Sequence, residues 1–262
     1  MRVLWLCLAL VVLPTLTGTA AGAIGERYVA GVDYTILPTP VSTHDPKRIE
    51  VVEVFSYVCP HCFHFDPTIA AWRAKQPADV DFQRLPAVWN PLWRMFGQGY
   101  YAAQSMNVAE TAHAGIFKAL HVEQKRIESS ADLAKLYAAS GVAAGDFLKT
   151  MDSFGVRASV QQADVRTRAY AVTGVPAMVV AGRYRVTGEI PGGNDAMLPI
   201  VDFLVQKERD ARASARPASG APKSASTKPA AAKPSKLSRS TSKSLGARTT
   251  THANKTEVAQ AR

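Results

Sequence analysis

A nearly continuous apolar run at residues 49–55 does most to limit the fold that this chain can adopt. Five of its seven side chains are large and apolar: Ile49, Val51, Val52, Val54 and Phe55. Such a β-branched run is typical of a strand that is covered on both faces, and only Glu53 interrupts it in an unexpected way. The sequence Cys59-Pro-His-Cys62 follows, and Pro60 suits the first turn of a helix. The sequence therefore predicts a buried strand that leads into a helix beginning at a cysteine pair.

The spacing of Cys59 and Cys62 indicates thiol chemistry rather than a structural cross-link. A disulfide that closes a loop of about four residues contributes only ~2 kcal/mol in the chain-entropy model. A chain of 262 residues can bury a core without that contribution. The unpaired N–H groups and the positive end of the helix dipole meet at Cys59, so they favour its thiolate over its thiol.

The first 23 residues have the pattern of a secretory signal peptide. Arg2 precedes an apolar stretch at residues 3–13, and Ala21-Gly-Ala23 supplies small residues for cleavage after Ala23. The apolar stretch is short for a membrane span, and an uncleaved anchor is the alternative. Cleavage would remove Cys7 and leave Cys59 and Cys62 as the only cysteines. Export to an oxidising compartment such as the periplasm makes their redox state the central question.

The formal net charge of +10 comes almost entirely from residues 210–262. This stretch holds eleven Lys and Arg residues against Asp210 and Glu257, a net charge of +9. The rest of the chain is nearly neutral, so the charge does not indicate nucleic-acid binding. The stretch is rich in Ala, Ser, Lys, Pro and Thr and contains no Phe, Trp or Tyr, which predicts a disordered basic tail. It is either a solvated, dispensable extension or a segment that contacts anionic envelope surfaces.

Residues 24–209 have the length and the pattern of one α/β domain. The expected elements are a second strand at 80–85, a helical insert at about 90–154, a helix at about 157–172, a hairpin at 176–186 and a closing helix from Pro199 to about Glu208. Within the insert, Ser130 is the expected helix cap and Gly141 the expected stop. Strand, redox motif at a helix start and a later strand preceded by Val-Pro form the layout of a thioredoxin-like domain.

Two segments carry a resemblance to a known family. Glu53-Val-Phe-Ser-Tyr-Val-Cys-Pro-His-Cys62 and Gly174-Val-Pro-Ala-Met178 resemble the motifs of DsbA-type periplasmic disulfide oxidoreductases, and the resemblance spans about residues 30–208. It implies an α/β fold of the thioredoxin type with an inserted helical domain. It also implies a low thiol pKa and an oxidising disulfide between Cys59 and Cys62.

The resemblance assigns roles to the residues of the motif. Cys59 would be the sulfur that reacts with substrates, and His61 would add a hydrogen-bond donor or partial positive charge beside it. Cys62, one helical turn further, should face inward and attack Cys59 to resolve a stalled mixed disulfide. Glu53 matches the buried acid of the family and would manage the proton of Cys62, with a basic partner such as Lys75. The alternative is an edge position where Glu53 reaches water, because an unpaired buried carboxylate is costly.

The second segment is expected to bind the substrate. The family carries a cis peptide bond before the proline that corresponds to Pro176, facing the redox pair. The backbone of Val175 would then be free to pair with an extended polypeptide. Four aromatic side chains either line an apolar groove nearby or pack in the core: Phe63, Phe65, Trp89 and Trp93.

The function implied is the introduction of disulfide bonds into exported proteins by thiol-disulfide exchange. The expected partners are reduced exported polypeptides and a quinone-linked membrane reoxidase of the DsbB type, with no bound cofactor and a monomeric protein. One alternative is a disulfide isomerase or reductase on the same fold. Another is a zinc-binding module built from Cys59, Cys62, His61 and His64, although the usual spacing and a second ligand arm are missing. The other histidines are expected on the surface: His44, His113 and His121.

Overall fold

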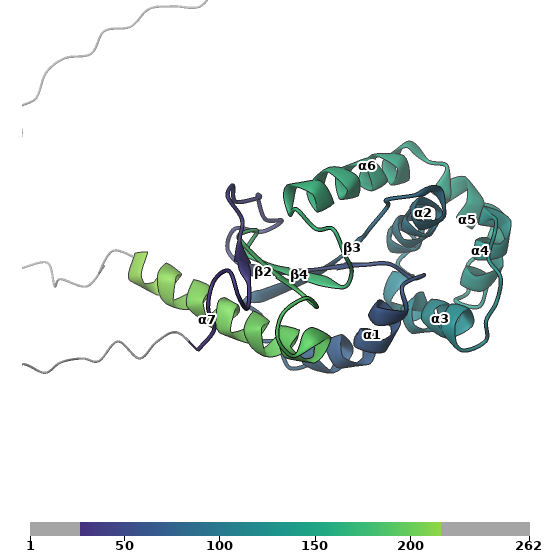
Figure 1. Cartoon of the computed structure of the whole chain (residues 1–262). Helices are drawn as coiled ribbons and strands as arrows, with labels where there is room; N and C mark the ends of the chain where they lie inside the picture. The colour runs from purple at the N-terminus through teal and green to yellow at the C-terminus, as the bar shows by residue number, and fades with distance from the viewer. Residues whose placement is uncertain (1–26, 216–262) are drawn as a thin grey trace, which may run out of the picture. The chain divides into compact units, whose positions relative to one another are not determined.

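The computed structural model describes residues 27–215. The predicted signal peptide at 1–23 and almost all of the predicted basic tail lie outside the described residues. Figure 1 shows a twisted sheet with helices on both faces. The sheet has five strands in the order β1-β5-β4-β2-β3: β1 (Thr35–Ile36), β2 (Ile49–Phe55), β3 (Val80–Pro86), β4 (Ala177–Val180) and β5 (Tyr184–Thr187). Strand β2 runs parallel to β3 and antiparallel to β4, so the sheet is mixed.

The helices divide into those that cover the sheet and those that form the insert. The helices are α1 (Pro60–Arg73), α2 (Pro91–Ser105), α3 (Ala109–His121), α4 (Ser130–Ala138), α5 (Ala144–Met151), α6 (Phe154–Ala169) and α7 (Met197–Ala215), with a short 3-10 helix η1 (Gly193–Ala196) before α7. Helices α1 and α7 lie on one face of the sheet and α6 on the other, while α2 to α5 gather at one end (Figure 1). The predicted α/β fold with a helical insert is confirmed. Within residues 27–215 the structure contains no helix with the length and apolarity needed to cross a bilayer.

Strand β2 is covered on both faces, as its sequence predicts, and all seven of its residues are buried. Because neighbouring side chains of a strand point to opposite faces, Val51 packs with α1 and α7, whereas Val52 packs with α6. The same alternation sends Glu50 and Glu53 to opposite faces of the sheet. The central strand therefore carries one buried acid into each layer.

Besides the apolar cores on the two faces of the sheet, a third core joins the end of β2 to the helical insert. We call it the insert core, and its members include Phe55, Tyr57, Cys59, Cys62, Phe117, Leu133 and Tyr137. Both cysteines thus belong to the same apolar cluster as helices α2 to α5. The helical insert therefore packs against the start of α1, where the redox motif lies.

The starts of two helices differ from the predictions. Ser129 rather than Ser130 caps α4, since its hydroxyl accepts a hydrogen bond from the Asp132 N–H. Helix α6 begins at Phe154, three residues earlier than expected, because the Ser153 side chain caps it by accepting from the Val156 N–H. In both cases a serine next to the expected start supplies the acceptor that the first turn needs.

Helix α7 continues past the predicted start of the tail at Asp210. It runs to Ala215, past the helix end that was expected at about Glu208. Arg209 forms a salt bridge with Asp79, which holds the helix against the chain before β3 at a point where apolar side chains have ended. The composition of residues 210–215 does not reveal this anchor.

Candidate active site

Cys59 lies immediately before α1, where the chain passes from an extended to a helical conformation. It is the N-cap residue, and Pro60 follows in the first turn, as predicted. Only 8% of Cys59 is exposed. In its thiol form the Sγ donates a long hydrogen bond of 3.5 Å to the carbonyl oxygen of Val175. The sulfur therefore stands between the helix start and the segment that precedes β4.

The surroundings of Cys59 favour its thiolate. A hydrogen bond from the Cys62 thiol is the main cause that lowers the pKa of Cys59, from its ordinary value of 9.0 to about 6. Partial burial opposes this shift, while the backbone N–H groups of Cys62 and His61 and the charge of His61 add to it. The thiolate thus uses donors at the helix start, whereas the thiol turns to the Val175 carbonyl. The helix start has the effect on the sulfur that the sequence predicted.

Cys62 contrasts with Cys59 in acidity, and none of its surface is exposed, compared with 8% for Cys59. It is fully buried in the insert core, one turn along α1, as predicted. Burial raises the pKa of its thiol far above the ordinary value, and its hydrogen bond to Cys59 raises it further. Both cysteines are free thiols in this structure. Two sulfurs in one short motif are therefore distinguished by environment alone: one ionises readily and the other holds its proton.

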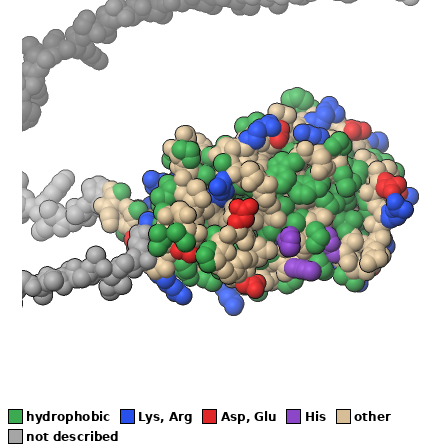
Figure 2. Space-filling view, in the orientation of Figure 1, with side chains coloured by type: hydrophobic (Ala, Val, Ile, Leu, Met, Phe, Trp, Pro, Cys, Tyr) green, Lys and Arg blue, Asp and Glu red, His purple; other side chains and the backbone are tan. Residues whose placement is uncertain are grey.

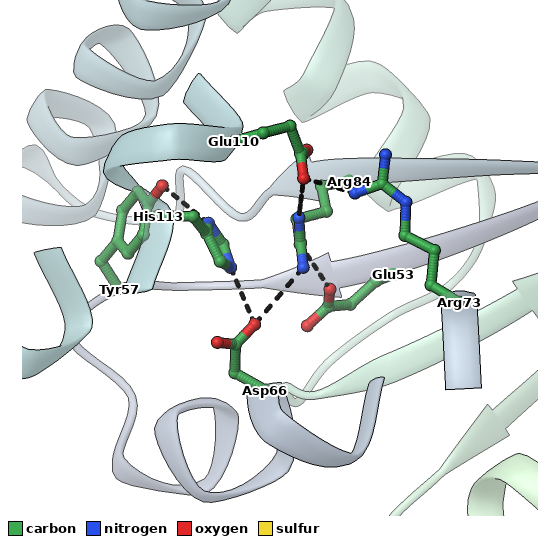
Figure 3. A network of polar contacts seen from close by, with 7 residues as sticks. All are labelled: Glu53, Tyr57, Asp66, Arg73, Arg84, Glu110 and His113. Atoms are coloured by element: carbon green, nitrogen blue, oxygen red, sulfur yellow. Dashed lines mark hydrogen bonds and ion pairs between the residues drawn. The ribbon is translucent and has the colours of Figure 1, made fainter. Parts of the chain in front are cut away.

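Glu53 is completely buried and is paired with Arg84 (Figure 3). The two residues lie opposite each other in the register of β2 and β3, and the Arg84 Nε donates to the Glu53 Oε2 over 3.1 Å. The partner is thus Arg84 and not Lys75, which is exposed after the end of α1. The alternative of an edge position in contact with water is wrong.

The pairing of Glu53 is incomplete. Its second oxygen, Oε1, has no hydrogen-bond partner among the described residues. Burial raises the pKa of Glu53 from its ordinary value of 4.5 to about 7, although the charge of Arg84 lowers it in part. The negative charge of Glu53 also contributes to the high pKa of Cys62, which places the two groups within electrostatic reach. A carboxyl group with this pKa can both give and take a proton near neutral pH.

Arg84 also connects Glu53 to a wider polar network (Figure 3). Its guanidinium contacts the Asp66 Oδ1 at 3.3 Å and a carboxylate oxygen of Glu110 at 3.0 Å. Arg73 joins the same Glu110 carboxylate from α1. Three carboxyl groups thus share two guanidinium groups, and Glu53 is the one that lies deepest.

The prediction that His113 is a surface residue is wrong. Its side chain is buried, with Nε2 at 3.0 Å from the Asp66 Oδ1 and Nδ1 at 2.9 Å from the Tyr57 hydroxyl. Since Asp66 can only accept, Nε2 carries the proton and the Tyr57 hydroxyl donates to Nδ1. Burial lowers the pKa of His113, so the ring is neutral at physiological pH. The spacing of Asp66 on α1 and His113 on α3 gives no local signal, because only the packing of α1 against α3 brings them together.

The other histidines lie nearer the surface. The His44 side chain is 72% exposed and contacts Asp81, so its expected surface position is confirmed. The ring of His121 is half-buried, stacks on Phe63 with centroids 4.9 Å apart, and donates from Nε2 to the Tyr57 carbonyl oxygen. Histidines lie beside a broad apolar surface that covers the helical end of the molecule (Figure 2).

The Val175–Pro176 peptide bond is cis, as the resemblance implied. Val175 and Pro176 line a cavity of about 380 Å³ together with His61, so the two sequence motifs meet at one depression. Of the four aromatic candidates, Phe65 is in the core, whereas Trp89 is 40% exposed and stacks on Trp93. Within residues 27–215, no group of three or more His, Cys, Asp or Glu side chains is arranged to hold a metal ion, which the zinc alternative would require.

Comparison with known proteins connects this geometry to one family. The family model described as "DSBA-like thioredoxin domain" matches residues 94–197. The thiol:disulfide interchange protein DsbA of Pseudomonas aeruginosa is 41% identical over 203 residues, which cover 78% of this chain and 95% of that protein. DsbA of Azotobacter vinelandii is 38% identical over 205 residues, covering 75% and 96% of the two chains. The crystal structure of the Pseudomonas aeruginosa DsbA superposes with a TM-score of 0.68 at 42% identity and covers 71% of this chain and 97% of that one.

Proposed function

Because the chain belongs to the DsbA family, and is therefore a thiol:disulfide oxidoreductase that introduces disulfide bonds, we propose that Cys59 and Cys62 form its redox-active disulfide. Cys59 is the sulfur that substrates attack, and Cys62 is the resolving sulfur. The observation that carries this assignment is the contrast between the two thiols: the pKa of Cys59 is lowered to about 6, whereas burial raises that of Cys62. The better leaving thiolate is the one that substrates can reach.

The reaction proceeds by two exchanges. A substrate thiolate attacks the Cys59 sulfur, the bond between Cys59 and Cys62 breaks, and a mixed disulfide joins the substrate to Cys59. The second substrate thiolate then attacks the substrate sulfur of that bond and releases Cys59 as a thiolate. The substrate loses two electrons to the protein, whose disulfide becomes a dithiol. Stabilisation of the Cys59 thiolate by the helix start drives the second exchange.

Glu53 supplies the proton that the first exchange requires. Cys62 leaves as a thiolate in an apolar core, where burial strongly favours its neutral thiol. Glu53, with a pKa raised to about 7, holds a proton in part of the molecules near neutral pH and can deliver it. Reoxidation reverses the transfer, since Cys62 must then lose its proton. Arg84 holds Glu53 in place through Oε2 and leaves Oε1 available.

The substrates are reduced, exported polypeptides that bind along the backbone of Val175. The cis-proline segment presents this backbone beside Cys59, and main-chain pairing accepts polypeptides of many sequences. A membrane reoxidase of the DsbB type, linked to quinones, restores the disulfide. Residues 1–23 act as a cleaved signal peptide that leads to the periplasm, where the protein works as a monomer. The basic stretch predicted at residues 210–262 either is a dispensable extension or contacts anionic envelope surfaces.

The assignment is tested with a reduced, cysteine-containing enzyme whose activity depends on its disulfides. The oxidised protein should restore that activity, and Cys59→Ser should abolish the effect. In the matched variant Cys62→Ser, oxidised glutathione first converts Cys59 to a mixed disulfide with glutathione. A substrate thiolate should then attack the Cys59 sulfur and release glutathione, so mixed disulfides between the protein and the substrate should appear on a non-reducing gel. Restored activity with Cys59→Ser would contradict the assignment of the nucleophile. The equilibrium of the pair with glutathione then separates an oxidant from a reductant.

A further inference from the structure

The cavity beside Cys59 contains one acidic side chain that the proposed chemistry does not use. Among the described residues that line it, only His61 and Glu189 are ionisable. Glu189 follows β5 and is exposed, and its carboxylate forms no hydrogen bond or ion pair with any residue of 27–215. An unpaired carboxylate at the wall of a cavity that also holds Val175 and Pro176 gives this part of the surface a local negative charge.

Glu189 also faces a second hollow. A smaller depression of about 180 Å³ lies along β5, and Thr187 and Glu189 line both depressions. Strand β1 pairs only with Tyr184 and Arg185, so no described strand covers the edge of β5 beyond Arg185. An extended polypeptide that enters beside Cys59 and continues along this edge passes the Glu189 carboxylate.

Neither basic residue that lines the two hollows is paired with Glu189. Arg185 lines only the second hollow, and its Nη1 donates to the backbone carbonyl oxygens of Tyr170 and Ala171. His61, at the start of α1, lines the first cavity together with Glu189, and no hydrogen bond or ion pair joins the two side chains. A basic side chain of a bound polypeptide is therefore the group that complements Glu189.

We propose that Glu189 is a specificity residue that favours polypeptides with a Lys or Arg close to the reacting cysteine. An extended chain advances by ~3.3 Å per residue, so the side chains within about three residues of that cysteine are the ones that reach the cavity wall. This inference rests on the proposed function, because it names the substrates that the Cys59 site prefers. It concerns local charge only: steering by the whole chain, with a formal net charge of +10, would favour acidic peptides instead.

The test uses two reduced peptides that share one cysteine pair and differ only in having Lys or Glu on both sides of the first cysteine. The rate at which each peptide reduces the oxidised full-length protein gives a Lys-to-Glu ratio. Glu189→Gln should lower this ratio about two- to fivefold at low ionic strength, as is typical of an exposed ion pair. Comparing ratios between variants cancels the effect of the flanking charge on the peptide thiol itself. The difference should shrink at about 0.5 M salt.

Two further variants make the result specific. Glu189→Lys should move the ratio further in the same direction as Glu189→Gln. Asp195→Asn removes an exposed acid in η1 that does not line the cavity, and it should leave the ratio unchanged. An identical ratio for the wild-type protein and Glu189→Gln would overturn the inference. If neither peptide reduces the wild-type protein, the proposed function fails instead, so the two failures are distinguishable.

Discussion

Strand β2 carries two buried glutamates that differ in how many of their carboxylate oxygens accept a hydrogen bond. This difference separates a structural ion pair from a proton-transfer group. Glu50 and Glu53 are both fully buried, and they point to opposite faces of the sheet. Both oxygens of Glu50 are bonded: Oε1 accepts from Arg166, and Oε2 accepts from the backbone N–H of His44 over 2.8 Å. Glu53 accepts from Arg84 through Oε2 only.

The comparison shows what decides the use of a buried carboxylate. A buried carboxylate is costly unless its oxygens are hydrogen-bonded, and both oxygens of Glu50 accept hydrogen bonds. At Glu53 one oxygen is unbonded, and the Arg84 charge is shared with Asp66 and Glu110. Burial therefore prevails and raises the pKa of Glu53 to about 7. Glu50 therefore forms a structural ion pair on one face of the sheet. Glu53, three positions further along the same strand, can exchange a proton on the other face.

The largest expected effect is the pH dependence that Glu53 gives to the free energy of unfolding. Its measurement would sharpen the comparison with Glu50. Its folded pKa is raised from 4.5 to about 7, so the folded protein holds a proton that the unfolded chain releases. Stability should then fall as pH rises from about 4.5 to about 7 and level off above that range. Glu53→Gln should remove a loss on the order of 3 kcal/mol over this window. Urea unfolding of the reduced protein at a series of pH values measures it.

The kinetic counterpart is the pH profile of the first exchange. Glu53→Gln keeps an acceptor for Arg84 but cannot move a proton, so the rate of Cys62 release should lose its dependence on a group with a pKa of about 7. The wild-type profile, with the same substrate, is the control. Equal stability slopes and equal rate profiles for the two proteins would show that Glu53 does not titrate in this range.

Glu50→Gln should have a somewhat smaller effect on stability and a different kind of effect. It leaves the Arg166 guanidinium, which is 24% exposed, without its negative partner. Breaking a buried ion pair costs about 3–5 kcal/mol, and partial solvation of Arg166 reduces the expected loss to about 2–3 kcal/mol. Unlike the loss at Glu53, it should come with an unchanged pH profile of thiol exchange. A change in that profile would break the contrast between the two acids.

The smallest effect is expected at His113, whose pKa is lowered by burial. His113→Phe leaves the Tyr57 hydroxyl and one contact of Asp66 unpaired, which should cost about 1 kcal/mol at pH 8. A buried neutral histidine loses its stabilising contribution as pH falls below its ordinary value of 6.5, so the difference from the wild-type protein should shrink in acid. His44→Gln, at an exposed position, is the matched control. A difference that grows in acid would mean that His113 is charged in the folded protein.

The sequence predicts the features that depend on neighbouring residues. The apolar run of β2, the helix start at Cys59 and the Val-Pro step before β4 are all local patterns, and the structure places them as expected. The partner of Glu53 could not be predicted in the same way. The Glu53–Arg84 pair depends on the register of two parallel strands that are separated in the sequence by α1, and no local pattern reveals that register.

His113 was misplaced for a related reason. Its partners Asp66 and Tyr57 come from the redox segment, far from His113 in the sequence. The periodicity of residues 109–121 alone could have warned of this, since His113 shares a face with Ile116 and Phe117, which are both buried. The sequence does not predict the burial of Glu50, because a single acid at the start of a strand is commonly exposed.

The complete burial of Cys62 has a consequence for chemical damage. Of the two cysteines within residues 27–215, peroxides and alkylating reagents reach Cys59 alone, whose thiolate is the more reactive form. A sulfenic acid formed at Cys59 condenses with the neighbouring Cys62 thiol, releases water and yields the intramolecular disulfide. The first product of oxidative injury is thereby converted into the working state of the protein, before irreversible sulfinic acid can form. The buried Cys62 thiol thus repairs Cys59, the sulfur that substrates must reach.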